Sequence, residues 1–445
     1  MKLCLRNIRL LYDNRELTHG AILVNTDSGT IEKICNDISP KECDVAVEFS
    51  RDYIALPGFV DIHVHCRDFE QAYKETIRTC TEAAAAGGVV TIYDMPNTRP
   101  RISNYEIAKK RLEKASKESK IEYRLHLGLP DNVEELDKIV KELNINSVKL
   151  YPEDIEKLET DTKYSRQFFE KVRELNITIV AHCESIKILR DLEDKYEHSI
   201  QNHAKLRPPE AEIASVLKII SLSMEYKIPH IHIAHVSHPD TVDIINMFRK
   251  YINITCEVTP HHLLISDSYC MEKFKDNPTI CKVNPPLRSE EIRRELLRRF
   301  MEGRIDCVAS DHAPHALFEK VKSYDECPPG FPGLETTSLL LLDMWRRGIL
   351  DIVDVVRLYS TNPCKVVKKD PPRIVEGNYA DIVVVDIKSK TVVRAEKFRS
   401  CAKYSPFEGY EANCSIVMTL YRGNVVYINE NYLGKLRGLE NISVV

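Results

Sequence analysis

Between residues 57 and 310, short apolar segments alternate with longer amphipathic ones, and this alternation constrains the fold more than any other feature. A short run of β-branched and apolar residues bounded by turn formers predicts a buried strand, and the longer segments predict helices. We predict strands at residues 57–65, 89–93, 121–129, 147–151, 177–182, 230–237, 252–258 and 305–310. We predict helices at residues 75–86, 105–120, 133–143, 165–175, 209–224, 241–251 and 290–302.

Eight predicted strands that alternate with helices indicate an α/β fold of the (β/α)8 TIM-barrel type, although an open doubly wound sheet has the same alternation. The distribution of polar residues favours the barrel. These residues follow the C-terminal ends of at least six strands, which is where barrel enzymes carry their active sites.

Both ends of the chain contain short β-like segments. They lie at residues 22–24, 30–34, 381–386, 416–421 and 424–427. The N-terminal segment is too small to form a core alone, so we expect it to pair with the C-terminal tail in a small composite β-sandwich. The predicted division is therefore residues 1–56 and 371–445 for the sandwich and 57–370 for the barrel.

Composition excludes several classes of function. The net charge is -4, from 63 basic and 67 acidic residues, which gives no support to nucleic-acid binding. No apolar run is long enough to span a membrane, and early charges argue against a secretory signal. The 14 cysteines form no CxxC pair, so we expect reduced thiols in a cytoplasmic protein. Cys66, Cys183 and Cys256 flank candidate functional residues, and we interpret them as packing residues.

Two histidines end the first predicted strand. His63 and His65 are two residues apart, so in an extended chain both side chains point to the same side. This arrangement suits a pair of metal ligands, although a solvated strand tip would have the same sequence.

Further candidate ligands follow other strands. Lys149, His182, His235 and Asp311 follow the fourth, fifth, sixth and eighth strands. A single histidine at a strand end is usually a hydrogen-bonded structural residue, but the whole set indicates a metal site. His232 lies three residues before His235, so it points to the opposite side and is interpreted as structural.

Lys149 is an unusual neighbour for a metal ion, because an ammonium group repels a divalent cation. Burial and nearby positive charge lower the pKa of a lysine and favour its neutral form. A neutral amine can add carbon dioxide to give a carbamate, which is an anionic ligand able to bridge two metals.

Seven segments together resemble the dihydroorotases of the cyclic amidohydrolase superfamily. They are residues 57–65, 95–98, 148–151, 256–262, 283–289, 310–315 and 329–336. The resemblance implies two zinc ions bound by His63, His65, Lys149, His182, His235 and Asp311, with Lys149 carboxylated and bridging. It also implies the reversible cyclisation of N-carbamoyl-L-aspartate to (S)-dihydroorotate with loss of water, in pyrimidine (UMP) biosynthesis.

Catalytic and substrate-binding roles follow from this resemblance. Asp311 is expected to take a proton from water and return it to the ring nitrogen. Arg67 is the candidate for binding the substrate carboxylate, because a guanidinium binds carboxylates bidentately. The family implies further substrate contacts from His65, Asn97, Asn284, His315, Pro329 and Gly330. Asn97 alone would also fit a turn former.

Other activities and partners remain alternatives. Allantoinase and dihydropyrimidinase share the barrel and the metals, but their substrates lack the ring carboxylate. A metal-free scaffold protein would have lost ligands, whereas every ligand position is filled here. The resemblance also allows a homodimer and an association with aspartate transcarbamoylase. The segment 152–154 lacks the threonine that a mobile catalytic loop carries in the animal enzyme.

Overall fold

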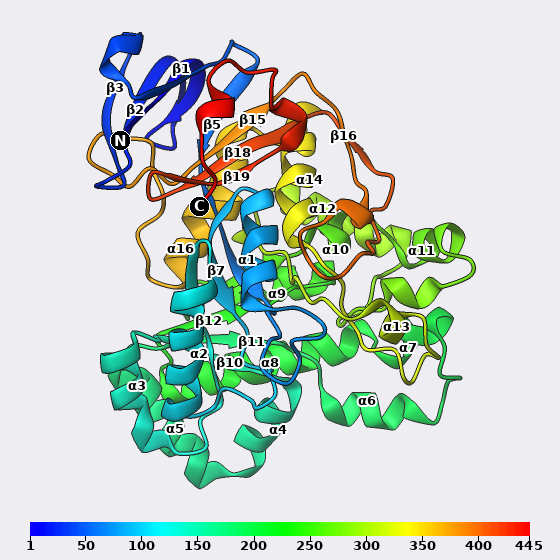
Figure 1. The fold of residues 1–445 in the computed structure, drawn as a ribbon. Coiled ribbons are helices and arrows are strands. Elements are labelled where there is room, and N and C mark those ends of the chain that lie inside the picture. The colour runs from blue at the N-terminus through cyan, green and yellow to red at the C-terminus, as the bar shows by residue number, and fades with distance from the viewer.

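The computed structural model describes residues 1–445 and consists of a barrel with a β-rich layer at one end (Figure 1). The barrel strands pair in parallel, in chain order. They are β6 (Phe59–Val64), β7 (Val89–Asp94), β8 (Glu122–Leu125), β9 (Leu127–Gly128), β10 (Ser147–Leu150), β11 (Thr178–Ala181), β12 (His230–Ile233), β13 (Ile254–Val258) and β14 (Cys307–Val308). Only His126 separates β8 from β9, so these two segments form the third strand of the barrel.

The barrel closes between its last and first strands. A parallel bridge joins Val64 to His312, and the backbone N–H of His65 donates to the carbonyl of His312 at 2.8 Å. Closure excludes the open doubly wound sheet and confirms the predicted (β/α)8 barrel.

The predicted helices are all present. They are α1 (Ile77–Ala86), α2 (Tyr105–Glu118), α3 (Leu136–Leu143), α5 (Thr162–Glu174), α8 (Pro209–Tyr226), α9 (Pro239–Phe248) and α12 (Glu290–Met301). Helix α1 ends at Gly87, as predicted, and Gly88 follows with φ of 76°. A Cβ at Gly88 would lie 2.7 Å from the side chain of Val383, so a side chain there would clash with the β-rich layer.

Several helices were not predicted. The eighth barrel helix, α14 (Leu334–Arg346), has ten buried residues, so it lacks the polar face on which a periodicity argument depends. The others are short segments within connections. They are α4 (Pro152–Thr160), α6 (Ile186–Glu193), α7 (His203–Leu206), α10 (Pro260–Leu264), α11 (Asp267–Lys273), α13 (Leu317–Lys320), α15 (Ile352–Val356) and α16 (Asn362–Val366).

The two chain ends form one sheet with the strand order β19-β18-β15-β5-β1-β2-β3, and β4 pairs with β1. These strands are β1 (Lys2–Tyr12), β2 (Glu16–Asn25), β3 (Thr30–Cys35), β4 (Val45–Glu48), β5 (Tyr53–Pro57), β15 (Ile382–Asp386), β18 (Ser415–Tyr421) and β19 (Asn424–Ile428). Antiparallel pairing of β5 with β15 joins the two ends, and 22 buried apolar residues form a separate core between the strands. The predicted composite of both termini is therefore confirmed. We propose the division at residues 56/57 and 370/371; strand β5 of the β-layer extends to Pro57, one residue past the first boundary.

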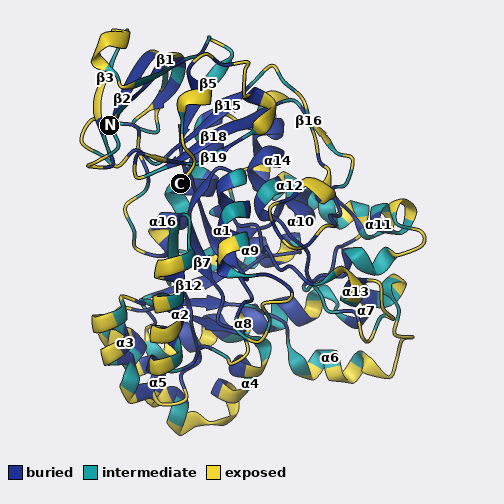
Figure 2. Ribbon diagram, viewed as in Figure 1, coloured by how far each residue is buried: buried dark blue, intermediate teal, exposed yellow.

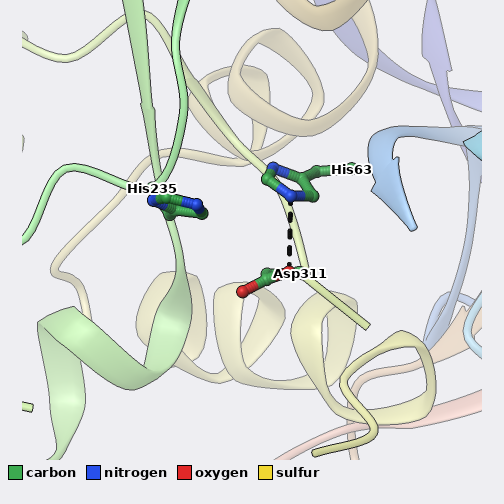
Figure 3. A group of neighbouring side chains, drawn as sticks. All are labelled: His63, His235 and Asp311. Carbon is green, nitrogen blue, oxygen red and sulfur yellow. Dashed lines mark ion pairs between the residues drawn. The ribbon is translucent and has the colours of Figure 1, made fainter. Parts of the chain in front are cut away.

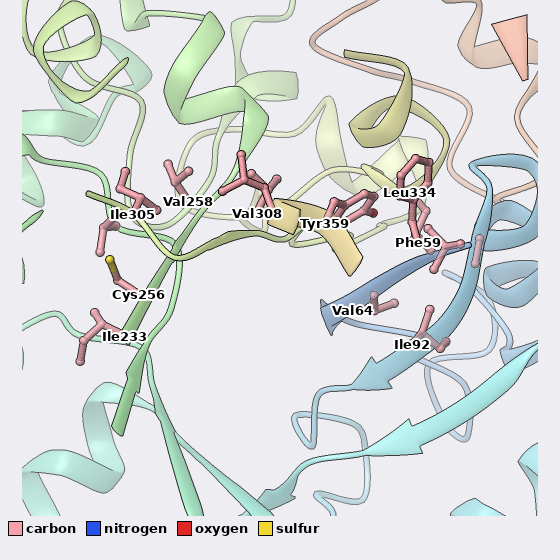
Figure 4. Close-up of a cluster of buried hydrophobic side chains, with 14 of the residues drawn as sticks. Phe59, Val64, Ile92, Ile233, Cys256, Val258, Ile305, Val308, Leu334 and Tyr359 are labelled. Atoms are coloured by element: carbon pink, nitrogen blue, oxygen red, sulfur yellow. The ribbon is translucent and has the colours of Figure 1, made fainter. Parts of the chain in front are cut away.

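Buried apolar side chains from β6, β7, β12, β13 and β14 belong to one hydrophobic core of 82 residues (Figure 4). Burial is concentrated in the strands, whereas α3, α5 and α6 expose their outer faces (Figure 2). None of the helices is both long and apolar enough to cross a membrane.

The cysteines correct one prediction. Cys4 pairs with Cys43, and Cys270 pairs with Cys281, so the expectation of reduced thiols was wrong for these four. The partners are 39 and 11 residues apart, and tertiary folding brings them together without a recognisable spacing. Cys66, Cys183 and Cys256 are free and buried, as expected of packing residues.

Candidate metal centre and substrate pocket

The structure brings the six predicted ligands to one end of the barrel. His63 lies in β6 and His65 just beyond it, Lys149 lies in β10, and the others follow their strands. Five of them line a cavity of about 310 Å³, namely His63, His65, His182, His235 and Asp311. Lys149 is fully buried beside this cavity.

His63, His235 and Asp311 converge, as Figure 3 shows, with potential ligand atoms that all lie within 4.8 Å of one another. Oδ1 of Asp311 is 3.4 Å from Nε2 of His63 and 3.2 Å from Nε2 of His65. The ring centres of His182 and His235 are 4.5 Å apart, which brings His182 to the same group. The imidazole and carboxylate donors have the chemistry that zinc prefers.

Two buried atoms in this group lack a hydrogen-bond partner, Nζ of Lys149 and Nδ1 of His235. A buried polar atom without a partner is costly, and a bound metal would remove that cost for His235. Burial lowers the pKa of Lys149 to about 8, although Glu257 and Asp311 oppose the shift. A neutral amine is therefore accessible near neutral pH, as carbamate formation requires.

The backbone at the site is in a conformation that non-glycine residues rarely adopt. His235 has φ of 33°, Asp311 has 47° and Arg67 has 52°. Such residues cluster at functional sites, where the surrounding structure holds them in place. No sequence pattern in this chain predicts these backbone conformations.

Glu257 of β13 holds His63 from behind. One carboxylate oxygen contacts Nδ1 of His63, and the other is 3.1 Å from Nε2 of His232. Nδ1 of His63 therefore carries the proton, and Nε2 is left to face Asp311 and a metal. His232 is structural, as predicted, but it acts by fixing Glu257. Sequence reasoning missed Glu257; the signal was a carboxylate within an otherwise apolar strand.

Asp61 ties the first strand of the barrel to the segment that carries Asp311. Its carboxylate accepts from the backbone N–H of His63 at 3.1 Å and from that of Ser310 at 3.1 Å. The hydroxyl of Tyr359 donates to it at 2.7 Å. Asp61 therefore fixes the relative position of His63 and Asp311, a role that the sequence did not predict.

A second carboxylate supports His182. Oε2 of Glu184 is 2.7 Å from Nε2 of His182, and Arg207 donates to both carboxylate oxygens at 2.9 and 2.5 Å. Burial opposes ionisation of Glu184, but Arg207 and His182 outweigh it and hold its pKa below the usual range. Nδ1 of His182 is thereby left for a metal.

The predicted substrate residues lie in the same cavity. Its lining includes Arg67, Asn97, Asn284, His315, Pro329 and Gly330. Oδ1 of Asn97 is 2.7 Å from Nδ1 of His65, and Oδ1 of Asn284 is buried without a partner. Tyr151, Glu153 and Arg207 also line the cavity and were missed. Glu153 lies in α4, so a helix begins where the sequence suggested a loop.

Residues 54–426 match the amidohydrolase family. The chain belongs to the amidohydrolase family. This membership makes it a metal-dependent hydrolase and agrees with the group of ligands at the end of the barrel.

The sequence is similar to curated dihydroorotases. It is 36% identical to the dihydroorotase of Pyrobaculum aerophilum, over 87% of this chain and 91% of that protein. It is 34% identical to the dihydroorotase of Methanothermobacter thermautotrophicus, over 95% of this chain and 94% of that protein. The resemblance to dihydroorotases is thereby confirmed.

Among solved structures, the fold is similar to that of a dihydropyrimidinase from Brevibacillus agri. The TM-score is 0.86 at 25% identity, and the match covers 97% of this chain and 96% of that one. The L-hydantoinase of Arthrobacter aurescens is also similar, with a TM-score of 0.85, 25% identity and 96% coverage of both chains. These structures support the barrel with its composite β-layer.

Proposed function

We propose that this chain is a dihydroorotase, which cyclises N-carbamoyl-L-aspartate reversibly to (S)-dihydroorotate with loss of water in pyrimidine biosynthesis. The similarity to curated dihydroorotases over most of both chains supports the activity. The observation that carries the choice of substrate is the buried guanidinium of Arg67, which lines the cavity beside the candidate metal ligands. Allantoin and dihydrouracil lack the carboxylate that such a group would bind.

We propose two zinc ions, held by His63, His65, His182, His235, Asp311 and a carboxylated, bridging Lys149. Six ligands are too many for one tetrahedral ion, and the residues with unpaired buried atoms fit this assignment. When bound, the two ions would polarise the amide carbonyl and lower the pKa of water.

Asp311 is placed to move the proton. Burial opposes its ionisation, but His63 and His65 outweigh burial and lower its pKa below the usual range. Its carboxylate is therefore ionised at neutral pH, takes the proton of the attacking water and delivers it to the ring nitrogen. Cyclisation runs through the same groups in reverse.

The substrate residues orient the ring. Arg67 and His315 bind the carboxylate, while Asn97 holds the ring of His65 at 2.7 Å. Asn284 offers its unpaired carbonyl oxygen to a ring N–H, and the backbone of Pro329 and Gly330, which also line the cavity, contacts the ring. These contacts place the reacting amide beside Asp311.

Substrate comparison tests the activity directly. Zinc-loaded protein should turn over dihydroorotate and leave allantoin and dihydrouracil unchanged. Turnover of either carboxylate-free ring in preference to dihydroorotate would assign the chain to another cyclic amidohydrolase. Anomalous diffraction at the zinc edge should show two sites per chain; a single site with all six side chains ordered would refute the binuclear centre.

We also propose a cytoplasmic location, a homodimer and an association with aspartate transcarbamoylase. Ten of the fourteen cysteines are free, which supports a reducing compartment, whereas the Cys4–Cys43 and Cys270–Cys281 disulfides argue against it. The two assemblies rest on the family resemblance. Light scattering of the protein alone, and with aspartate transcarbamoylase, measures both.

A further inference from the structure

A buried lysine lies behind the proposed carboxylate site. Lys74 precedes α1, and only 9% of its side chain is exposed. Its Nζ is 3.0 Å from Nδ1 of His315 and 3.0 Å from Oε1 of Glu319. We propose that Lys74 is a positioning residue that fixes the tautomer of His315 with the ring proton on Nε2, so that this nitrogen cannot accept from Arg67 and the guanidinium stays available to the substrate carboxylate. This inference rests on the proposed function.

Two of the three hydrogen-bonding contacts of His315 favour one tautomer, and the third, from Arg67 to Nε2, favours the other. A lysine ammonium can only donate, so Nδ1 of His315 must accept and the ring proton must be on Nε2. An independent contact agrees, because Nε2 lies 3.0 Å from the carbonyl oxygen of Pro329, which can only accept. Burial lowers the pKa of His315, and Arg67 and Lys74 lower it further, so the ring is neutral.

This tautomer decides what Arg67 can bind. Nη2 of Arg67 is 3.1 Å from Nε2 of His315. With the proton on Nε2, that nitrogen donates to the carbonyl of Pro329 and cannot accept from Arg67, so the guanidinium N–H is free for a substrate carboxylate. With the proton on Nδ1, the free Nε2 would accept from Arg67 and occupy the guanidinium. Lys74 therefore keeps Arg67 available to the substrate.

Glu319 keeps Lys74 in place. Its Oε1 is 3.0 Å from Nζ of Lys74, and its Oε2 accepts from the backbone N–H of Ala316 at 3.1 Å. Arg67 holds its own orientation by donating from Nε to the carbonyl of Pro314 at 3.0 Å. The two cations are thus anchored separately, and His315 lies between them.

The first test measures the tautomer and needs no turnover. Nitrogen-15 NMR of histidine-labelled, zinc-loaded protein distinguishes Nε2–H from Nδ1–H, and a His315→Gln spectrum assigns the signal. The wild-type protein should show Nε2–H at His315, and Lys74→Met should lose this preference. A wild-type Nδ1–H signal, or an unchanged signal in Lys74→Met, would overturn the proposal. Because this readout is independent of activity, an inactive wild-type protein would refute the proposed function alone.

The second test separates binding from chemistry. Lys74→Met should raise KM for dihydroorotate about 10-fold or more, as expected for a weakened charge-assisted contact, while kcat and zinc content change little. Lys74→Arg should recover part of the loss, because a guanidinium can also donate to Nδ1. Lys322→Met removes the same charge from an exposed residue of the same region and should behave as wild type. Equal KM values for Lys74→Met and Lys322→Met would refute the positioning role.

Discussion

At the residue scale, buried carboxylates determine which nitrogen of His63 and of His182 faces the metal centre. Glu257 holds Nδ1 of His63, and Glu184 holds Nε2 of His182. Because the two carboxylates contact opposite ring nitrogens, the two histidines present different atoms to the centre. Such supporting contacts orient metal ligands and raise their basicity.

Glu257→Ala should therefore lower zinc affinity by about 10–100-fold, which is the usual effect of losing such a partner. Glu257→Gln should lose less, because its carbonyl oxygen still accepts from Nδ1–H of His63. Competition with a zinc chelator measures both variants. Wild-type zinc affinity in a folded Glu257→Ala protein would show that Glu257 does not support the centre.

Arg67→Met should reduce kcat/KM for dihydroorotate by at least about 10–100-fold, since a charge-assisted contact contributes about 1.5–3 kcal/mol. Arg67→Lys should restore only part of the activity, because the ammonium of lysine cannot form the two parallel hydrogen bonds that a planar guanidinium makes with a carboxylate. Zinc content should stay at the wild-type value. Full activity of Arg67→Met with intact metal would remove Arg67 as the carboxylate anchor and weaken the case against the other cyclic amidohydrolases.

The residues at strand ends could be predicted because the two-residue period of a strand fixes their direction locally. His63 and His65 illustrate this. Their supporting residues could not be predicted in the same way, because Glu257 is 194 positions from His63 and only the closed barrel brings them together. Lys74 was missed for the same reason, since its partner His315 is 241 positions away.

At the element scale, a buried ion pair connects helix α2 to the first part of the site. Nη2 of Arg111 is 2.6 Å from Oδ2 of Asp94, and both side chains are fully buried. The other oxygen of Asp94 accepts from the backbone N–H of Cys66 at 2.8 Å, directly after His65. The pair therefore holds the chain that carries His65 and Arg67.

Arg111→Met should lower the free energy of unfolding by about 3–5 kcal/mol, because it leaves Asp94 charged and buried without its partner. Arg190→Met is the matched control. Arg190 pairs with Glu156 at 2.8 Å, but the two side chains are 64% and 38% exposed, so its loss should cost less than about 1 kcal/mol. Urea denaturation measures both; equal losses would contradict the assigned role of burial.

Helices were predicted correctly where polar residues mark an exposed face with the helical period. They were missed where burial of the whole element removes the difference between a polar and an apolar face. Helix α2 was predicted because charged residues mark its exposed face. Helix α14 was not predicted, because residues Thr336–Met344 are all buried and no exposed polar face marks the helix. A loop was expected after Lys149, but helix α4 begins there at Pro152 and brings Glu153 to the cavity.

At the scale of the whole molecule, the barrel and the β-layer share buried contacts. The hydroxyl of Thr419 donates to the carbonyl of Ala85 at 2.7 Å, which joins β18 to α1. The pairing of the two termini was predictable, because the N-terminal segment is too small to form a core alone. The two disulfides were not predictable, because no spacing marks them.

Glu335 joins the same two parts and predicts a pH dependence of stability. It lies on α14 of the barrel, and its Oε1 accepts from the backbone N–H of Ser400 at 3.1 Å. Burial raises its pKa from 4.5 to about 7, although backbone donors oppose the shift. A carboxyl group whose pKa is higher in the folded state favours folding fully below pH 4.5, and this contribution is lost as the pH rises through 7.

Glu335→Gln should therefore remove that pH dependence while keeping an oxygen that accepts from Ser400. The rise from 4.5 to about 7 corresponds to at most about 3 kcal/mol. The variant should gain stability relative to wild type as the pH rises from 5 to 8, approaching that value at pH 8. Urea denaturation at both pH values measures the difference. A constant difference between the two proteins would show that Glu335 is ionised throughout this range, and that its partial burial between the barrel and the C-terminal segment has no electrostatic cost.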